Sequence, residues 1–290
     1  MMTTVIDRSR RAAALGKRAA AEIALLRRDA FINAPPSAQT AIDAVPDKWA
    51  SSLPASLGEV RAGSVDLFDD ERIHWALEQL GGVQGETVLD LGPLEGGHSY
   101  MAHQAGARKV VGVEANSKAF LKCLVTKELL ELDRCRFLCG DVAQYLEQTT
   151  ERFDTCIACG ILYHMVDPVA LIELISRRAT KLIMWTHVYA DEALSKSELA
   201  ARLGPAQESA YGDFNYRLHR HGYGLDTRLS GFFGGVAGHS NWMPRDDLMR
   251  TLDHFGWRSV RVAFDEPHHQ NGPALALVAV RDAPSAPEAE

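Results

Sequence analysis

From residue 69 onward, short apolar runs alternate with longer segments whose apolar positions recur at helical spacing. The runs predict strands over residues 85–92, 109–115, 134–141, 152–160 and 181–188, and the segments predict helices over 69–80, 96–107, 117–132, 142–148 and 168–178. Strands that are apolar on both faces and separated by helices are typical of a parallel sheet, covered on both sides and joined by right-handed crossovers. The pattern therefore predicts an α/β protein with a doubly wound sheet.

The end of the chain departs from this alternation. A helix is expected over 244–255, and strands over 257–266 and 274–281 follow it. The polar turn between the two strands contains Asn271-Gly272-Pro273, so they can pair as an antiparallel hairpin. We therefore expect seven strands, mostly parallel, with the antiparallel hairpin at the end of the sheet.

A long insertion separates the fifth predicted strand from the helix at 244–255. Its start, 191–203, is expected to be helical, and the rest is rich in glycine and aromatic residues. Insertions after the carboxyl end of a strand overhang the ligand crevice in such folds, so this one is interpreted as a substrate cover. The resulting organisation is a basic helix and loop arm at 1–65, a core at 66–187, the cover at 188–243, the closing helix and hairpin at 244–282 and a disordered tail at 283–290.

Composition and charge narrow the class of protein. The 290 residues are 46% hydrophobic and 24% charged, which excludes a disordered or collagenous chain. No apolar run approaches the roughly 20 residues that cross a bilayer, and the start has no apolar signal core. We therefore expect a cytoplasmic protein with no membrane partner, in which the five cysteines are reduced thiols.

The net charge of −7 is unevenly distributed. Residues 1–30 carry a net +4, which leaves −11 for the rest of the chain. An acidic body disfavours nucleic acid as a partner, because phosphate contacts need clustered lysine and arginine. The basic segment has apolar residues at helical spacing and is interpreted as an amphipathic helix for docking or for forming a homodimer, rather than for membrane or RNA contact.

A glycine turn follows the first strand, in the sequence Val88-Leu89-Asp90-Leu91-Gly92-Pro93-Leu94-Glu95-Gly96-Gly97. Glycine allows the backbone to approach a ligand, and the following helix offers unpaired N–H groups. Leu94 stands where the middle glycine of a dinucleotide motif would be, which weakens that reading. Glu114 ends the next strand 22 residues after Gly92, where an acid can accept ribose hydroxyls, and Asp141 ends the third. Three acids at consecutive strand ends favour a nucleotide site over a set of helix caps.

These residues resemble the class I S-adenosylmethionine-dependent methyltransferases, whose fold is Rossmann-like. The resemblance covers roughly residues 69–186 and the final hairpin. It is carried by Leu91–His98, Glu114-Ala115-Asn116, Phe120–Leu124, Gly160–Met165 and Asn271-Gly272-Pro273, which look like a bacterial branch of small-molecule or glycan methyltransferases. The Leu162-Tyr163-His164 element is also similar to tRNA wobble-uridine carboxymethyltransferases.

The resemblance implies a site for S-adenosyl-L-methionine. It places Asp90, Gly92, Pro93 and Gly96 around the methionine part, and Glu114 with Ala115 at the ribose. Asp141 and Val142 would flank the adenine, and Cys159 and Gly160 would line the sulfonium side. Strand-end carboxylates suit a ligand that carries an ammonium and a sulfonium group.

Methyl transfer to a hydroxyl needs a base as well as alignment. His164 and His187 follow the fourth and fifth strands, and histidine suits proton removal near neutral pH. His164 has an equal claim as a ring that anchors its loop. Tyr163 is a third catalytic candidate, since it could hold the acceptor or cover the sulfonium, although a packed loop aromatic is commoner.

The insertion and the final turn carry further candidates. The aromatic and amide side chains of the insertion suggest a wall for a sugar or ring, although a cap over the sheet edge would use many of the same residue types. The residues are Tyr211, Asn215, Tyr216, Arg217, His239, Asn241 and Trp242. No metal site is expected. His268-His269 with Asp265 and Glu266 match no ligand template, and Cys156 and Cys159 lie three apart on one strand and should point to opposite faces.

The first hypothesis is an O-methyltransferase that acts on a small molecule or sugar. The second is a tRNA-modifying (carboxy)methyltransferase, disfavoured by the acidic body and by the lack of an evident arginine or lysine to pair with an added carboxylate. A non-catalytic cofactor-binding subunit is the third. A dehydrogenase is disfavoured by Leu94 and by Asp141.

Overall fold

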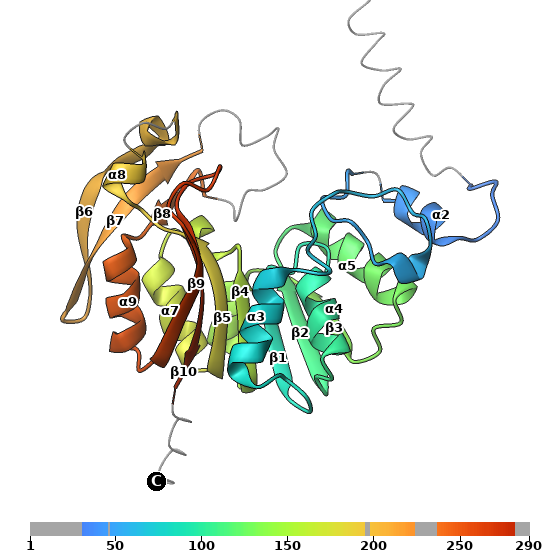
Figure 1. Cartoon of the computed structure of the whole chain (residues 1–290), viewed down its shortest axis with the longest axis horizontal. Helices are drawn as coiled ribbons and strands as arrows, with labels where there is room; N and C mark the ends of the chain where they lie inside the picture. Colours follow the sequence, from blue (N-terminus) through green and yellow to red (C-terminus); the bar gives the residue numbers. More distant parts are fainter. Residues whose placement is uncertain (1–30, 46, 195–197, 224–236, 282–290) are drawn as a thin grey trace, which may run out of the picture. The chain divides into compact units, whose positions relative to one another are not determined.

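The computed structural model describes residues 31–45, 47–194, 198–223 and 237–281 (Figure 1). The predicted basic helix within 1–30 and the tail at 283–290 lie outside these residues. The chain divides into the units 1–41 and 42–290, and every feature discussed below belongs to the second. In the part of the chain that is described, no helix is both long and apolar enough to cross a membrane.

The helices, in chain order, are α2 (Ala38–Asp43), η1 (Ala55–Leu57), α3 (Glu71–Leu80), α4 (Gly97–Gln104), α5 (Ser117–Leu129), α6 (Val142–Gln148), η2 (Leu162–His164), α7 (Pro168–Ser176), α8 (Asp191–Leu194), η3 (Glu198–Arg202) and α9 (Arg245–His254). The strands are β1 (Thr87–Leu91), β2 (Lys109–Glu114), β3 (Cys135–Cys139), β4 (Phe153–Cys159), β5 (Ala179–His187), β6 (Leu203–Tyr211), β7 (Phe214–Gly222), β8 (His239–Trp242), β9 (Arg258–Glu266) and β10 (Ala274–Val280).

Seven strands form one sheet in the order β3-β2-β1-β4-β5-β10-β9. The pairs among β1 to β5 are parallel, and β10 runs antiparallel between β5 and β9. This arrangement confirms the predicted Rossmann-like sheet with its closing hairpin (Figure 1). The chain leaves β1 towards β2 and returns at β4, so ligands are expected at the carboxyl ends of β1 and β4.

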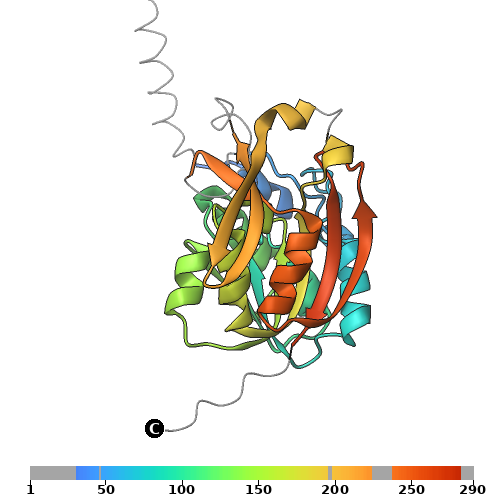
Figure 2. The same cartoon turned by 90° about the vertical axis from the view of Figure 1, so that its left-hand side faces the viewer.

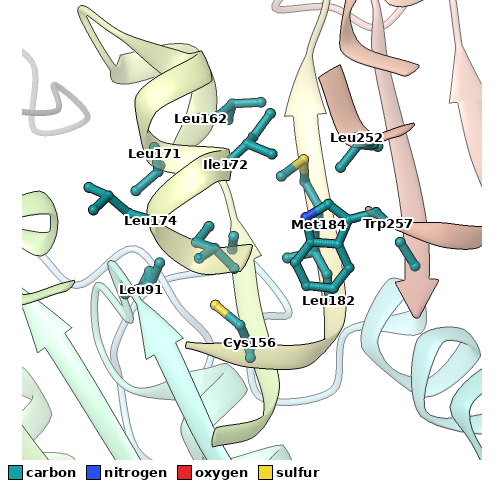
Figure 3. Close-up of a cluster of buried hydrophobic side chains, with 14 of the residues drawn as sticks. Leu91, Cys156, Leu162, Leu171, Ile172, Leu174, Leu182, Met184, Leu252 and Trp257 are labelled. Carbon is teal, nitrogen blue, oxygen red and sulfur yellow. The ribbon is translucent and has the colours of Figure 1, made fainter. Parts of the chain in front are cut away.

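Helices cover both faces of this sheet. On one face, α3, α4 and α5 pack on strand side chains such as those of Val88 and Val110. On the opposite face, α6, α7 and α9 pack on Leu89, Leu91 and their neighbours. Figure 3 shows this second cluster, in which side chains of α7 and α9 meet those of β4 and β5. The period of two in each strand thus produces a three-layer core.

The cysteines follow the same alternation. Cys156 packs in the cluster beneath α7 (Figure 3). Cys159, three residues later, packs against the cluster on the α3 side. Both are free thiols, and burial raises the pKa of Cys159 to about 12. The prediction that these two side chains face opposite sides of the sheet is confirmed.

The start of the insertion after β5 is helical, as expected: α8 and η3 cover 191–194 and 198–202, and residues 195–197 lie outside the described part of the chain. The strands that follow were not expected. Strands β6, β7 and β8 form an antiparallel sheet, and α9 lies between its β6–β7 hairpin and strands β9 and β10 (Figure 2). In β7, buried Tyr216 and Leu218 alternate with exposed Asn215 and Arg217, the period of two that marks a half-buried strand.

Candidate functional site

The glycine turn at the end of β1 has left-handed backbone at three alternate residues. Gly92 has φ 71°, Leu94 has φ 54° and Gly96 has φ 87°. A leucine pays about 1–2 kcal/mol for this conformation, which glycine adopts freely. Leu94 therefore keeps the backbone shape that the middle glycine of such a motif provides, and it does so under strain.

Glu114 holds this turn in place from the end of β2. Its carboxylate oxygens accept hydrogen bonds from the backbone N–H groups of Leu94, at 2.9 Å, and Asn116, at 2.8 Å. Burial raises the pKa of Glu114, although the two amide donors act in the opposite direction. The predicted ribose acid is therefore a buried group that fixes the glycine turn.

Asp90 lies fully buried at the end of β1. It accepts a hydrogen bond from Ser99 Oγ at 2.6 Å, and burial raises its pKa. Asp141 behaves differently: it is exposed, and its Oδ1 accepts from the Gln144 N–H, which makes it the N-cap of α6. The helix-cap interpretation that the strand-end pattern disfavoured therefore applies to Asp141, because the helix starts at the residue that follows it.

The remaining predicted cofactor residues differ in whether their side chains are free to reach a ligand. Gly160 has φ 85° directly after β4, and a Cβ there would lie 3.8 Å from the Tyr163 hydroxyl. Pro93 packs towards β2, Val142 is buried in the core and Ala115 is exposed. Only the backbone of Pro93 and Val142 is left to contact a ligand.

Aromatic rings and imidazoles gather beyond the carboxyl ends of β4 and β5. We call this group the ring cluster; it comprises Tyr163, His164, Trp185, His187, His221, Tyr223, Trp242 and His269. Tyr163 lies at its centre, with its ring 4.5 Å from His187, 5.9 Å from Trp185 and 6.2 Å from Trp242. The structure therefore brings all three predicted catalytic residues together.

His187 has a fixed tautomer. Its Nδ1 lies 2.9 Å from the carbonyl oxygen of Gly272, and because a carbonyl only accepts, Nδ1 carries the hydrogen. The lone pair of the neutral ring is then on Nε2. Burial lowers the pKa of His187 to about 4, despite the opposing effect of the carbonyls of Pro273 and Gly272, so the ring is neutral near pH 7.

Gly272 also explains the Asn271-Gly272-Pro273 turn. It has φ 110°, and a Cβ there would come within 2.7 Å of the Trp242 ring and of Leu199. Trp242 in turn stacks on His187, with ring centroids 5.0 Å apart and planes at 6°. A glycine at 272 thus lets the turn reach both the base candidate and the tryptophan above it.

His164 and Tyr163 are also neutral near pH 7. Burial lowers the pKa of His164 to about 4, with further lowering from His187 and His221, and burial raises the pKa of Tyr163. His164 Nδ1 lies 3.4 Å from the Tyr223 hydroxyl, which suits the loop-anchoring role. Two buried polar atoms of the cluster, Trp242 Nε1 and His221 Nε2, have no hydrogen-bond partner among the described residues.

The predicted substrate wall is only partly at the ring cluster. Trp242 belongs to it, and Asn241 ties β8 to the loop after β4 by donating from its side chain to the Val166 carbonyl. His239 begins β8, at the position paired with Gly222. Four other residues, near the β6–β7 turn, pack towards α9 instead: Tyr211, Asn215, Tyr216 and Arg217.

The structure places those four residues away from the ring cluster. Arg217 pairs with the buried carboxylate of Asp247 in α9 at 2.9 Å, and the Tyr211 ring packs edge-on against Phe255. Trp242 pairs with His219, four residues along β7 from Asn215, a separation of roughly 13 Å at strand rise. Aromatic composition alone could not say which end of the hairpin faces the site.

Several residues of this region escaped the sequence analysis. Trp185 stacks in the ring cluster, and the guanidinium carbon of Arg72 lies 4.7 Å from its ring centroid. Arg72 lies in the first turn of α3, a helix whose sequence carries no motif. The only feature of the sequence that could have pointed to Arg72 is that this helix precedes β1 and the glycine turn. Among the described residues, no group of three or more potential metal ligands forms, and Asp265 pairs with Arg245.

A buried ion pair fixes the glycine turn from the other side. Glu95 is fully buried, and it accepts hydrogen bonds from Lys122 Nζ and from the backbone N–H groups of Ala50 and Ser51, each at 2.8 Å. Lys122 also lies 5.5 Å from the Trp49 ring. Part of the predicted N-terminal arm is therefore attached to the core at the cofactor turn.

Replacing Lys122 with methionine should destabilise the protein by about 3–5 kcal/mol, because Glu95 would be left as an unpaired buried charge. The free energy of unfolding in urea measures this. The control is Lys118→Met, whose pair with Asp47 at 2.9 Å is more exposed and should be worth at most about 1 kcal/mol. Equal effects of the two changes would show that the Glu95 pair has no special role.

The strand order and the glycine turn after β1 are those of a Rossmann-like fold. Residues 83–213 match a family model described as a methyltransferase domain. The N-terminal domain of EvdMO1, solved in the presence of SAH and D-fucose, superposes with a TM-score of 0.63 over 84% of this chain and 95% of that one, at 17% identity.

Curated relatives match a shorter segment. A tRNA U34 carboxymethyltransferase of Alteromonas mediterranea is 24% identical over 148 residues, 47% of this chain and 44% of the relative. The enzyme of that name from Campylobacter hominis is 33% identical over 93 residues, 32% of each chain. The chain thus spans less than half the length of these curated relatives.

The N-terminal domain of EvdMO1 has also been solved with SAH bound, and the donor set of the present site fits S-adenosyl-L-methionine. Asp90 and Glu114 are buried acids with raised pKa values, so a ligand that is cationic and rich in hydroxyls would compensate them. The positive φ of Gly92, Leu94 and Gly96 lets the backbone of the turn approach a ligand closely. Glu114 would hold the ribose, and Asp90 the methionine end.

Proposed function

We propose that the protein methylates a hydroxyl group of a small molecule or sugar, with His187 as the general base. The observation that carries the proposal is the tautomer of His187, whose Nδ1 hydrogen is fixed on the Gly272 carbonyl and whose Nε2 is left basic. Tyr163 lies between this imidazole and Gly160, the residue expected on the sulfonium side. A base in this position suits an acceptor that must lose a proton.

When bound, S-adenosyl-L-methionine would supply an electrophilic methyl group, with S-adenosylhomocysteine as the leaving group. His187 Nε2 would take the proton of the acceptor hydroxyl as the oxygen receives the methyl group. Trp242 stacks on the imidazole and keeps its plane in place. The unpartnered N–H of Trp242 and the Nε2 atom of His221 suit a second polar group of the acceptor.

The test is transfer of a labelled methyl group to a panel of sugars, phenols, amines, carboxylates and tRNA. Label in a hydroxyl compound, absent with the His187→Ala protein, supports the proposal. Label only in amines or only in tRNA would overturn it.

A tRNA substrate is the second candidate, because the curated relatives are named for tRNA U34 carboxymethylation. The net charge of −7 acts against it, since tRNA binding needs a basic surface. Salt-sensitive retention of tRNA by the purified protein, lost when residues 1–30 are removed, would favour this candidate over the first.

The pH dependence of kcat/KM should follow the low pKa of the base. Because burial lowers the pKa of His187 to about 4, the neutral form is present at all higher pH values. We expect a plateau around neutral pH and a fall as the pH drops towards about 4, with the protein still folded by circular dichroism. The His164→Gln protein should show the same profile; a midpoint near the ordinary histidine value of about 6.5 would contradict the assignment.

A further inference from the structure

We propose that Arg72 binds a carboxylate at the junction between the cofactor and acceptor sites. This inference rests on the proposed use of S-adenosyl-L-methionine, and it assigns a binding residue that neither the glycine turn nor the ring cluster contains. The carboxylate is either that of the cofactor's methionine part or one carried by the acceptor.

Arg72 lies between the two sites. Its guanidinium carbon is 4.7 Å from the ring centroid of Trp185, whose ring is 4.9 Å from that of His187. On its other side, Asp70 contacts His98 Nε2 at 3.0 Å, in the first turn of α4 directly after the glycine turn. The Trp185 ring therefore links the guanidinium to the proposed base, and the Asp70–His98 contact links it to the helix that follows the cofactor turn.

The hydrogen bonds of Arg72 leave donors unused. Asp70 accepts from Nε at 2.8 Å and from Nη2 at 2.6 Å, so the guanidinium is held on one edge. A guanidinium has five N–H groups in a rigid fork. Within the described residues, Nε and Nη2 of Arg72 donate to Asp70 and Nη1 donates no hydrogen bond, and the side chain is only 25% exposed.

The charges around Arg72 also favour a second anion. Asp70 is shared between Arg72 and His98; burial opposes its ionisation, but these two partners outweigh burial and hold its pKa low. Cys159 and Tyr163 also interact electrostatically with Arg72. Burial raises the pKa of both, to about 12 for Cys159, so both are neutral near pH 7. Asp70 is thus the anionic partner of Arg72 among these groups, and Cys159 and Tyr163 add no negative charge.

A carboxylate is the anion that this geometry suits. Arginine binds carboxylates through two parallel N–H groups, and such charge-assisted bonds are stronger than neutral ones. The buried acids of the glycine turn, Asp90 and Glu114, would repel a carboxylate placed beside them. A fixed cation at the edge of that turn offsets the repulsion.

Calorimetry on the full chain separates the two sources. S-adenosylhomocysteine carries the methionine carboxylate, and 5′-methylthioadenosine lacks the amino-acid part. If the source is the cofactor, Arg72→Gln should weaken S-adenosylhomocysteine binding by about tenfold to a hundredfold and leave 5′-methylthioadenosine unchanged. Arg72→Lys, which keeps the charge and loses the fork, should show a smaller loss.

The second arm uses protein saturated with S-adenosylhomocysteine. Glucuronate carries a carboxylate that glucose lacks. If the carboxylate that Arg72 binds belongs to the acceptor, glucuronate should bind to the wild type more tightly than glucose. Arg72→Gln should then remove this difference in affinity. Arg261→Gln is the matched control, since Arg261 bonds Gln79 at the other end of α3 and should alter neither arm.

Equal affinities of wild type and Arg72→Gln for all four compounds, with unchanged melting temperature, would overturn the assignment of Arg72 alone. Failure of the wild type to bind either adenosine compound would overturn the cofactor site and this proposal with it. A lower melting temperature with uniform weakening of both adenosine compounds would show a structural role for Arg72 and also overturn the proposal.

Discussion

Replacing His187 with alanine is expected to lower kcat by about 10²–10⁴-fold, the usual contribution of a positioned general base. The reason is that Nδ1 is committed to the Gly272 carbonyl, so Nε2 is the nitrogen that can take a proton. Cofactor affinity should stay within about twofold, because the glycine turn and Glu114 are untouched. Single-turnover rates and calorimetry with S-adenosylhomocysteine measure the two effects separately.

A matched control is His103→Ala. His103 is a buried histidine of α4 whose Nε2 contacts Asp133, just before β3, at 2.9 Å, and it takes part in none of the ring contacts of the ring cluster. Its loss should affect stability and leave kcat unchanged. A folded His187→Ala protein with kcat close to that of the wild type would remove His187 from the mechanism.

Replacing Glu114 with alanine is expected to weaken cofactor binding by about 10²–10³-fold, from the loss of hydrogen bonds to a charged acceptor. The change also leaves the Leu94 N–H without its partner, so the strained turn loses its support. Glu114→Gln keeps one acceptor oxygen and the side-chain size, and it should bind with intermediate affinity. Calorimetry with S-adenosylhomocysteine gives the affinities.

Asp154→Ala provides the comparison for Glu114. Asp154 also accepts from a backbone N–H, that of Thr87 at 2.8 Å, but in the first half of β4, away from the ligand edge. This change should lower stability without weakening binding. Loss of affinity equal to that of Glu114→Ala would mean that the glutamate acts only through general stability.

The sheet and its helices were predictable because their signals are local. Buried runs such as Val88–Leu91 and capped helices such as 142–148 carry their pattern within a few residues. The small sheet was missed because its strands depend on pairing with one another. In β7, the aromatic and amide character of residues such as Asn215 and Tyr216 suggested a binding wall, whereas the alternation of buried Tyr216 and Leu218 with polar residues marks a strand that packs on α9.

The site likewise contains residues that could be predicted from local position and residues that could not. Glu114 and His187 stand at strand ends, where the topology of a parallel sheet determines their place. Asp141 stands at such an end too, but the helix that starts beside it uses its carboxylate as a cap. Arg72 could not be predicted, since its nearness to Trp185 depends on how α3 packs against β5. Long-range packing of this kind has no signature in the spacing of residues.

Titration of S-adenosylhomocysteine into the purified full chain is the most direct test of the central claim, that the glycine turn and Glu114 form a cofactor site. We expect saturable binding of one molecule per chain, strongly weakened by Glu114→Ala and unchanged by Asp154→Ala. No binding to the folded wild-type protein, or equal binding by the Glu114→Ala protein, would contradict it.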